Sequence, residues 1–239
     1  MVRESIKHYH SDDNSGIYTF THNKHDKDKV SSSYHAIIEE LIVDDDNSDY
    51  QIKEQCRCEF EFEGDSKGFE GAFGMPGLDG EFYIVGLCEG NHCSESRKGD
   101  KGHGQMVLMK KNKMNESVVN GTSSVDSSCL WETVKMIDIP KTANFIDYSD
   151  IEVTPSGKVA ITSQENSAFW LGQMIGIEGG VLDPDKIAFN ETSYKVFDFP
   201  KSNQCQTVYC NIEGITFIND EMIMAVSDKM KKKGKQPYW

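Results

Sequence analysis

Residues 211–228 read NIEGITFINDEMIMAVSD, and this stretch contains the pattern on which the fold prediction depends. Glu213 opens a short apolar run, a turn and a second apolar run follow, and Asp228 closes the stretch. The same order recurs from Asp150 to Glu165 with the same separation of 15 residues, and from Glu70 to Glu89 with a separation four residues longer. Such a repeat predicts one supersecondary unit that is stacked several times and buries a shared apolar face.

Further apolar runs with β-type composition complete these units. The first unit predicts strands at 71–73, 82–87, 105–109 and 131–137, and the second at 151–154, 158–162, 168–172 and 194–197. The third unit offers two strands, at 215–218 and 222–226. Four antiparallel strands per unit are typical of a β-propeller blade. The predicted fold class is therefore all-β, a β-propeller of four-stranded antiparallel blades that is incomplete in this chain.

The predicted organisation is a polar N-terminal segment at residues 1–30, with one strand-like run at 17–21, and a propeller fragment at residues 31–239. The fragment holds about two full blades plus partial blades. Because a propeller needs at least four blades, and an open ring leaves sheet edges unpaired, we expect further blades after Trp239.

Bulk composition excludes several function classes. The chain has 239 residues and a formal net charge of −14, so extensive binding to nucleic acid is not expected. No run approaches the roughly 20 apolar residues of a membrane span. Residues 1–7 lack the apolar core of a secretory signal. This favours the cytoplasm by default, with secretion left open for a sequence incomplete at its start.

The chain has seven cysteines and three acceptor sequences for N-glycosylation. Two cysteine pairs are close enough in sequence to form disulfides in an oxidising compartment: Cys88 with Cys93, and Cys205 with Cys210. The acceptor sequences, which begin at Asn115, Asn120 and Asn190, suit the same setting. Acceptor sequences also arise by chance, so the compartment and the disulfide state stay open.

Two short motifs resemble those of a known family. Residues 67–71 (KGFEG) and 211–215 (NIEGI) resemble the Glu-Gly signature of the esterase-like phytase and related six-bladed, TolB-like β-propellers. Residues 226–229 are similar to the acidic strand end that follows the Glu-Gly signature in that family. In the second unit, Asp150-Ile151 replaces Glu-Gly. The resemblance spans about residues 60–229. It implies a propeller fold and a calcium-assisted phosphoester hydrolase.

In a propeller the first strand of each blade lines the central channel, so acids at equivalent positions would gather there. The predicted metal ligands are Glu70, Asp150, Glu213, Glu89, Glu165 and Asp228. Calcium suits such a set because it prefers several oxygen ligands in flexible geometry, and Asn166 and Asn211 could complete its shell. The alternative is that these acids accept hydrogen bonds from backbone N–H groups of the adjoining blade and hold neighbouring blades together.

Residues 89–93 (EGNHC) supply the remaining candidates. His92 is a candidate general acid, and the predicted ligand-binding residues are Asn91, Asn166, Asn211 and Lys229. Two functions are therefore expected in parallel. One is a calcium-assisted phosphoester hydrolase with an anionic small-molecule ligand. The other is a non-catalytic propeller scaffold that binds protein or carbohydrate at its rim.

Overall fold

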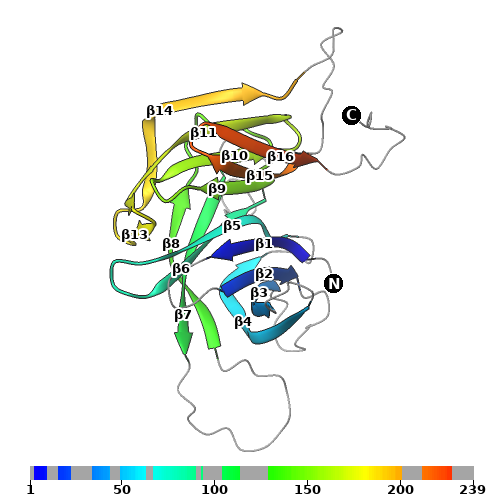
Figure 1. Cartoon of the computed structure of the whole chain (residues 1–239), viewed down its shortest axis with the longest axis vertical. Helices are drawn as coiled ribbons and strands as arrows, with labels where there is room; N and C mark the ends of the chain where they lie inside the picture. Colours follow the sequence, from blue (N-terminus) through cyan, green and yellow to red (C-terminus); the bar gives the residue numbers. More distant parts are fainter. Residues whose placement is uncertain are drawn as a thin grey trace, which may run out of the picture.

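A computed structural model of the chain describes residues 3–9, 16–22, 34–43, 49–62, 67–89, 93, 104–113, 129–200 and 212–227, with the backbone alone for residues 3–9, 16–22, 43 and 113. All regular secondary structure in these ranges is β-strand (Figure 1). The all-β fold class is therefore confirmed. The described ranges contain no helix that is long and apolar enough to cross a membrane.

The N-terminal half forms one eight-stranded sheet from two antiparallel meanders. The first meander comprises β1 (Arg3–Tyr9), β2 (Gly16–His22), β3 (Tyr34–Val43) and β4 (Tyr50–Phe62). The second comprises β5 (Phe69–Pro76), β6 (Phe82–Cys88), β7 (Gln105–Lys113) and β8 (Cys129–Asp138). The strand order is β1-β2-β3-β4-β8-β7-β6-β5, so the last strands of the two meanders lie side by side.

The C-terminal half contains a four-stranded sheet and two hairpins. The sheet has the order β14-β11-β10-β9, from β9 (Asp150–Val153), β10 (Lys158–Ser163), β11 (Ala168–Ile175) and β14 (Ala188–Asp198). One hairpin pairs β12 (Ile177–Glu178) with β13 (Val181–Leu182). The other pairs β15 (Ile212–Asn219) with β16 (Met222–Ser227).

The structure does not show the predicted set of separate four-stranded blades, because its first eight strands form one continuous sheet. Strands β4 and β8 pair in parallel through Arg57 with Leu130 and Cys58 with Trp131, which joins the first two meanders into one sheet. Strands β1 and β2 of this sheet come from residues 1–30, the segment that its polar sequence distinguished from the rest of the chain. Four strands therefore precede β5.

The first strands of successive units contact one another. Strand β1 contacts β5, β5 contacts β9, and β9 contacts β15. Figure 1 shows these four strands in succession through the middle of the molecule. Strands β5, β9 and β15, which begin the three aligned stretches of sequence, therefore follow one another in space.

The second meander is the central layer of the core. Val85 and Leu87 of β6 belong to one apolar cluster, which also contains Trp170 of β11. Ile84, directly before Val85 in sequence, faces a second cluster that contains Trp131 of β8. Because successive side chains of a strand point to opposite faces, β6 is buried on both sides. The second meander is covered by the β9–β14 sheet on one face and by strands of the first meander on the other.

Two disulfides are present among the described cysteines. Cys88 pairs with Cys93, as predicted from their spacing. Cys56 of β4 pairs with Cys129 of β8 across a sequence separation of 73, which sequence spacing did not indicate. Cys205 and Cys210 lie outside the described residues. The Cys56–Cys129 bond links the two meanders at the parallel junction of β4 and β8.

We predict that removing the long-range disulfide destabilises the fold more than removing the short one. In the chain-entropy account a loop of 73 residues corresponds to about 4 kcal/mol and a loop of five residues to about 2 kcal/mol. The double variant Cys56→Ala/Cys129→Ala should therefore unfold at a clearly lower denaturant concentration than Cys88→Ala/Cys93→Ala. Equal midpoints for the two variants in equilibrium unfolding would contradict this prediction.

Candidate functional site

Asp150 is a buried carboxylate at the start of β9, with 6% of its surface exposed. Its Oδ1 atom accepts a hydrogen bond from the backbone N–H of Ile151 at 2.8 Å. Its Oδ2 atom accepts one from the backbone N–H of Ile215 in β15 at 2.9 Å. A buried carboxylate needs such donors, because an unpaired charge in the interior is strongly unfavourable. The side chain therefore links the second unit to the third.

Ser149 makes a second link between the same two strands. Its hydroxyl donates to the carbonyl oxygen of Ile212 at 2.8 Å and lies 3.0 Å from Thr162 Oγ1. The Thr162 hydroxyl lies 3.3 Å from the carbonyl oxygen of Asp150. All three polar residues are buried, so these bonds form where water does not compete. Strand β15 is held to β9 on both sides of Glu213-Gly214.

The first unit approaches Asp150 at Gly71 of β5. A Cβ atom at Gly71 would lie 2.7 Å from Asp150 Oδ1 and 2.8 Å from the backbone nitrogen of Ile151. The backbones of β5 and β9 therefore approach too closely for any side chain at this position. The absence of a side chain at Gly71 is therefore what permits this approach of β9. Three units thus converge on Asp150.

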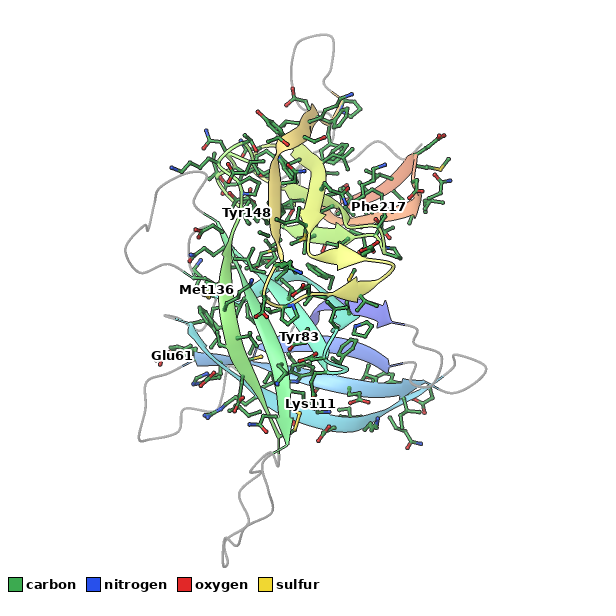
Figure 2. The ribbon with its side chains drawn as sticks, turned by 90° about the vertical axis from the view of Figure 1, so that its left-hand side faces the viewer. Glu61, Tyr83, Lys111, Met136, Tyr148 and Phe217 are labelled. Atoms are coloured by element: carbon green, nitrogen blue, oxygen red, sulfur yellow. A yellow bond between two sulfur atoms is a disulfide. The ribbon has the colours of Figure 1, made fainter. Side chains whose placement is uncertain are left out.

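Tyr148 fixes the segment that leads into Asp150. The ring is buried, and its hydroxyl donates to the carbonyl oxygen of Ala143 at 2.9 Å. Figure 2 labels Tyr148 in the half of the molecule that holds the β9–β14 sheet. Burial raises the pKa of Tyr148 to about 12, so this hydroxyl stays protonated as a donor at neutral pH. The loop before β9 therefore has a defined conformation.

The three acids that the sequence aligned do not have equivalent geometry. Glu70 and Glu213 each lie at a register shift, between Phe69 and Gly71 in β5 and between Ile212 and Gly214 in β15. Asp150 instead pairs in regular register with Thr162. Glu213 is exposed and accepts a hydrogen bond from Gln164 Nε2 at 3.4 Å, whereas Glu70 is half-buried.

The acids that follow the second strands are engaged locally. Glu89 Oε2 lies 3.1 Å from Lys67 Nζ. The Glu165 side chain is exposed, and its backbone N–H donates to the Asp147 carboxylate at 3.1 and 3.2 Å. Asn166 accepts the backbone N–H of Ile146 through Oδ1 at 2.8 Å, which secures the loop before β9. The other predicted site residues, Asn91, His92, Asn211, Asp228 and Lys229, lie outside the described residues.

No common ion site brings the aligned acids together within the described residues. The potential metal-ligating group found there consists of Glu54, Cys56 and Cys129, whose ligand atoms lie within 4.8 Å of one another. Both of its sulfur atoms are bonded to each other in the disulfide, so this set does not fit a metal. The described positions of Glu70, Asp150 and Glu213 do not form such a group.

A separate charged cluster lies where the first two meanders meet. Lys111 of β7 contacts Glu40 of β3 at 3.1 Å and also pairs with Glu54 of β4, and Lys53 pairs with Glu40. Burial opposes ionisation of Glu40, but its hydrogen bonds to the two lysines keep its pKa below the ordinary value. Figure 2 labels Lys111 at this junction.

Beside this cluster is a hollow of about 540 Å³. Its lining carries charges of both signs, from Glu81, Lys110, Lys111 and Glu132, together with Phe82 and Asn112.

Sequence reasoning missed the polar partners of Asp150. Ser149 and Thr162 bond to each other, and Thr162 also bonds to the Asp150 carbonyl oxygen. Neither residue belongs to a metal or catalytic motif, so nothing marked them as functional. A usable signal was Thr162-Ser163, two polar residues directly after the apolar run at 159–161 in β10, and the structure buries both fully. Buried hydroxyls in a strand end indicate hydrogen bonds to a neighbouring element.

Comparison with known proteins found no matching family model, no matching curated protein and no matching solved structure. Arguments about function therefore depend on the geometry of this chain.

We predict that Asp150→Asn destabilises the fold, whereas Glu213→Gln, the same chemical change at the aligned position, leaves stability nearly unchanged. An amide at position 150 places an N–H group against one of the two backbone donors, and a buried donor without a partner costs about 1–3 kcal/mol. Glu213 is exposed, so its amide remains solvated. Equilibrium unfolding of both variants measures the difference. Similar losses of stability would contradict the structural role of Asp150.

Proposed function

We propose that the chain is a non-catalytic scaffold of the β-propeller type, with units that fan around a common axis and an outer surface that binds a protein partner. The observation that carries this proposal is the commitment of the Asp150 carboxylate to two backbone N–H groups. A side chain used in this way holds units together and is not available for a substrate.

The propeller-type arrangement is supported by strand order and by contacts. The meander β5–β8 and the sheet β9-β10-β11-β14 each contain four antiparallel strands that begin with the strand carrying the aligned acid. The first strands contact one another in the order β1, β5, β9, β15. Units that fan around an axis bring their first strands together in this way.

A protein partner is supported by the surface of β16. Met222, Met224 and Val226, at alternate positions, are each about half exposed, at 55%, 49% and 57%. In the first two units the equivalent strands β6 and β10 pair with a third strand and are largely buried, whereas β16 pairs only with β15 among the described strands. A strand edge that is unpaired among the described strands and carries an apolar row favours association, and flexible methionines adapt to a partner surface.

A calcium-assisted phosphoester hydrolase is the second candidate. It is favoured by Glu70 and Glu213, which occupy equivalent positions before a glycine and at equivalent register shifts. Glu213 is exposed, so it could reach a ligand without a burial cost.

Calcium titration and a phosphoesterase assay distinguish the two candidates. For a scaffold we expect calcium to leave the melting temperature unchanged relative to magnesium at the same ionic strength, and no phosphate release from a phosphomonoester. Wild type, Glu213→Gln and Glu178→Gln, an exposed acid outside the predicted metal ligands, should behave alike. Calcium-dependent phosphate release that Glu213→Gln abolishes, and Glu178→Gln retains, would overturn the scaffold in favour of the hydrolase.

A further inference from the structure

The two disulfides indicate where the chain matures. Cys56–Cys129 joins two meanders across 73 residues, and Cys88–Cys93 closes a short loop. Bonds of this kind form and persist in oxidising compartments such as the secretory pathway. Acceptor sequences for N-glycosylation therefore become chemically meaningful in this chain, provided that the structure exposes them.

The acceptor sequence Asn190-Glu191-Thr192 lies in β14, the outermost strand of its sheet (Figure 1). Strand β14 leaves the ladder at this point. Asn190 pairs with Gln173 and Lys195 pairs with Leu171, so four residues of β14, 191–194, oppose the single residue Gly172 of β11. Such an insertion makes the strand bulge outward. Glu191 and Thr192 are exposed, and Asn190 is half-buried.

The bulge has a defined shape because aromatic rings secure both of its ends. Phe189, just before Asn190, packs edge-on against Trp170 with ring centroids 5.6 Å apart. Tyr194, at the far end, stacks on the same Trp170 ring at 6.1 Å and an interplanar angle of 10°. Trp170 is fully buried, so it is a fixed platform. The acceptor residues between the two contacts are presented outward.

Within the bulge, Asn190 and Thr192 are already joined. Asn190 Oδ1 accepts hydrogen bonds from the Thr192 hydroxyl at 2.7 Å and from the Thr192 backbone N–H at 3.0 Å. Asparagine side chains commonly form such local turns. These bonds involve only the oxygen of the amide. The nitrogen Nδ2, which is the atom that glycosylation modifies, takes no part in them.

We infer that Asn190 is an N-glycosylation site. The donor is an oligosaccharide linked to a polyprenyl diphosphate. Asn190 Nδ2 bonds to C1 of the first sugar, the bond from C1 to the diphosphate oxygen breaks, and the diphosphate leaves with the bonding electron pair. Nδ2 loses one proton in the same exchange, so no oxidant or reductant is required.

The glycan would shield an apolar edge. Tyr194, Val196 and Phe197 of β14 are 44%, 46% and 39% exposed, close to Asn190 along the same outer strand. An exposed apolar edge strand is a template for aggregation, and a bulky hydrophilic group nearby blocks pairing with another sheet.

The test is expression of the full chain behind a secretory leader in eukaryotic cells. Enzymatic deglycosylation in heavy-oxygen water followed by peptide mass spectrometry then assigns each modified asparagine. We expect the peptide containing Asn190 to carry the heavy aspartate. The mark should be lost in Asn190→Gln and Thr192→Val and retained in Thr192→Ser, which keeps a hydroxyl at the acceptor position.

Two results would overturn the inference. One is secreted, disulfide-bonded protein in which Asn190 is unmodified. The other is modification confined to Asn115 or Asn120. Thr192→Val keeps Asn190 but removes the hydroxyl of the acceptor sequence. Loss of the mark in both Thr192→Val and Asn190→Gln would therefore reflect loss of the acceptor sequence and not a folding defect caused by one substitution.

Discussion

The hydrogen bond from the backbone of Ile215 to the Asp150 carboxylate is the contact on which the joining of units depends. Apolar contacts between units are plentiful but non-directional, so they do not by themselves fix which backbone group faces which. A buried carboxylate is strongly unfavourable unless its donors are in place, and this requirement selects one arrangement of β15 against β9. The Ser149 hydroxyl, bonded to Ile212, sets the same register from the other side of Glu213.

The first two meanders are joined by a different interaction. Their last strands meet in parallel, and the Cys56–Cys129 disulfide and the cluster around Lys111 close that junction. The second meander is consequently held on both faces, by covalent and ionic contacts toward β3 and β4 and by apolar and backbone contacts toward β9. Strand β16, with its exposed methionines, lies at the far end of this succession.

Much of the strand pattern could be predicted from the sequence, because each apolar run is a local signal. Strands β6, β10, β15 and β16 lie where their runs indicated, and Trp131 and Trp170 are core residues. Strand β1 was not predicted, since its sequence, RESIKHY, is largely polar. The start of β14 at Ala188 was also missed, because the bulge at residues 191–194 interrupts its pattern.

The site was only half predictable for a physical reason. A carboxylate at a strand start can accept hydrogen bonds from backbone N–H groups or bind a cation, and sequence does not distinguish the two. Whether the neighbouring donors point at it depends on register, which long-range pairing sets. For Asp150 the alternative in which acids hold neighbouring units together describes the contacts found. The long-range disulfide was equally hidden, because its two cysteines belong to different meanders.

Amide hydrogen exchange at Ile215 in the unmodified protein tests the central claim most directly. An N–H group that donates to a buried carboxylate exchanges only when β15 separates from β9. We predict that the Ile215 amide exchanges as slowly as that of Ile161 within the β9–β14 sheet. Exchange of Ile215 as fast as that of the exposed end of the hairpin at Asp220 would show that the bond to Asp150 does not hold the units together.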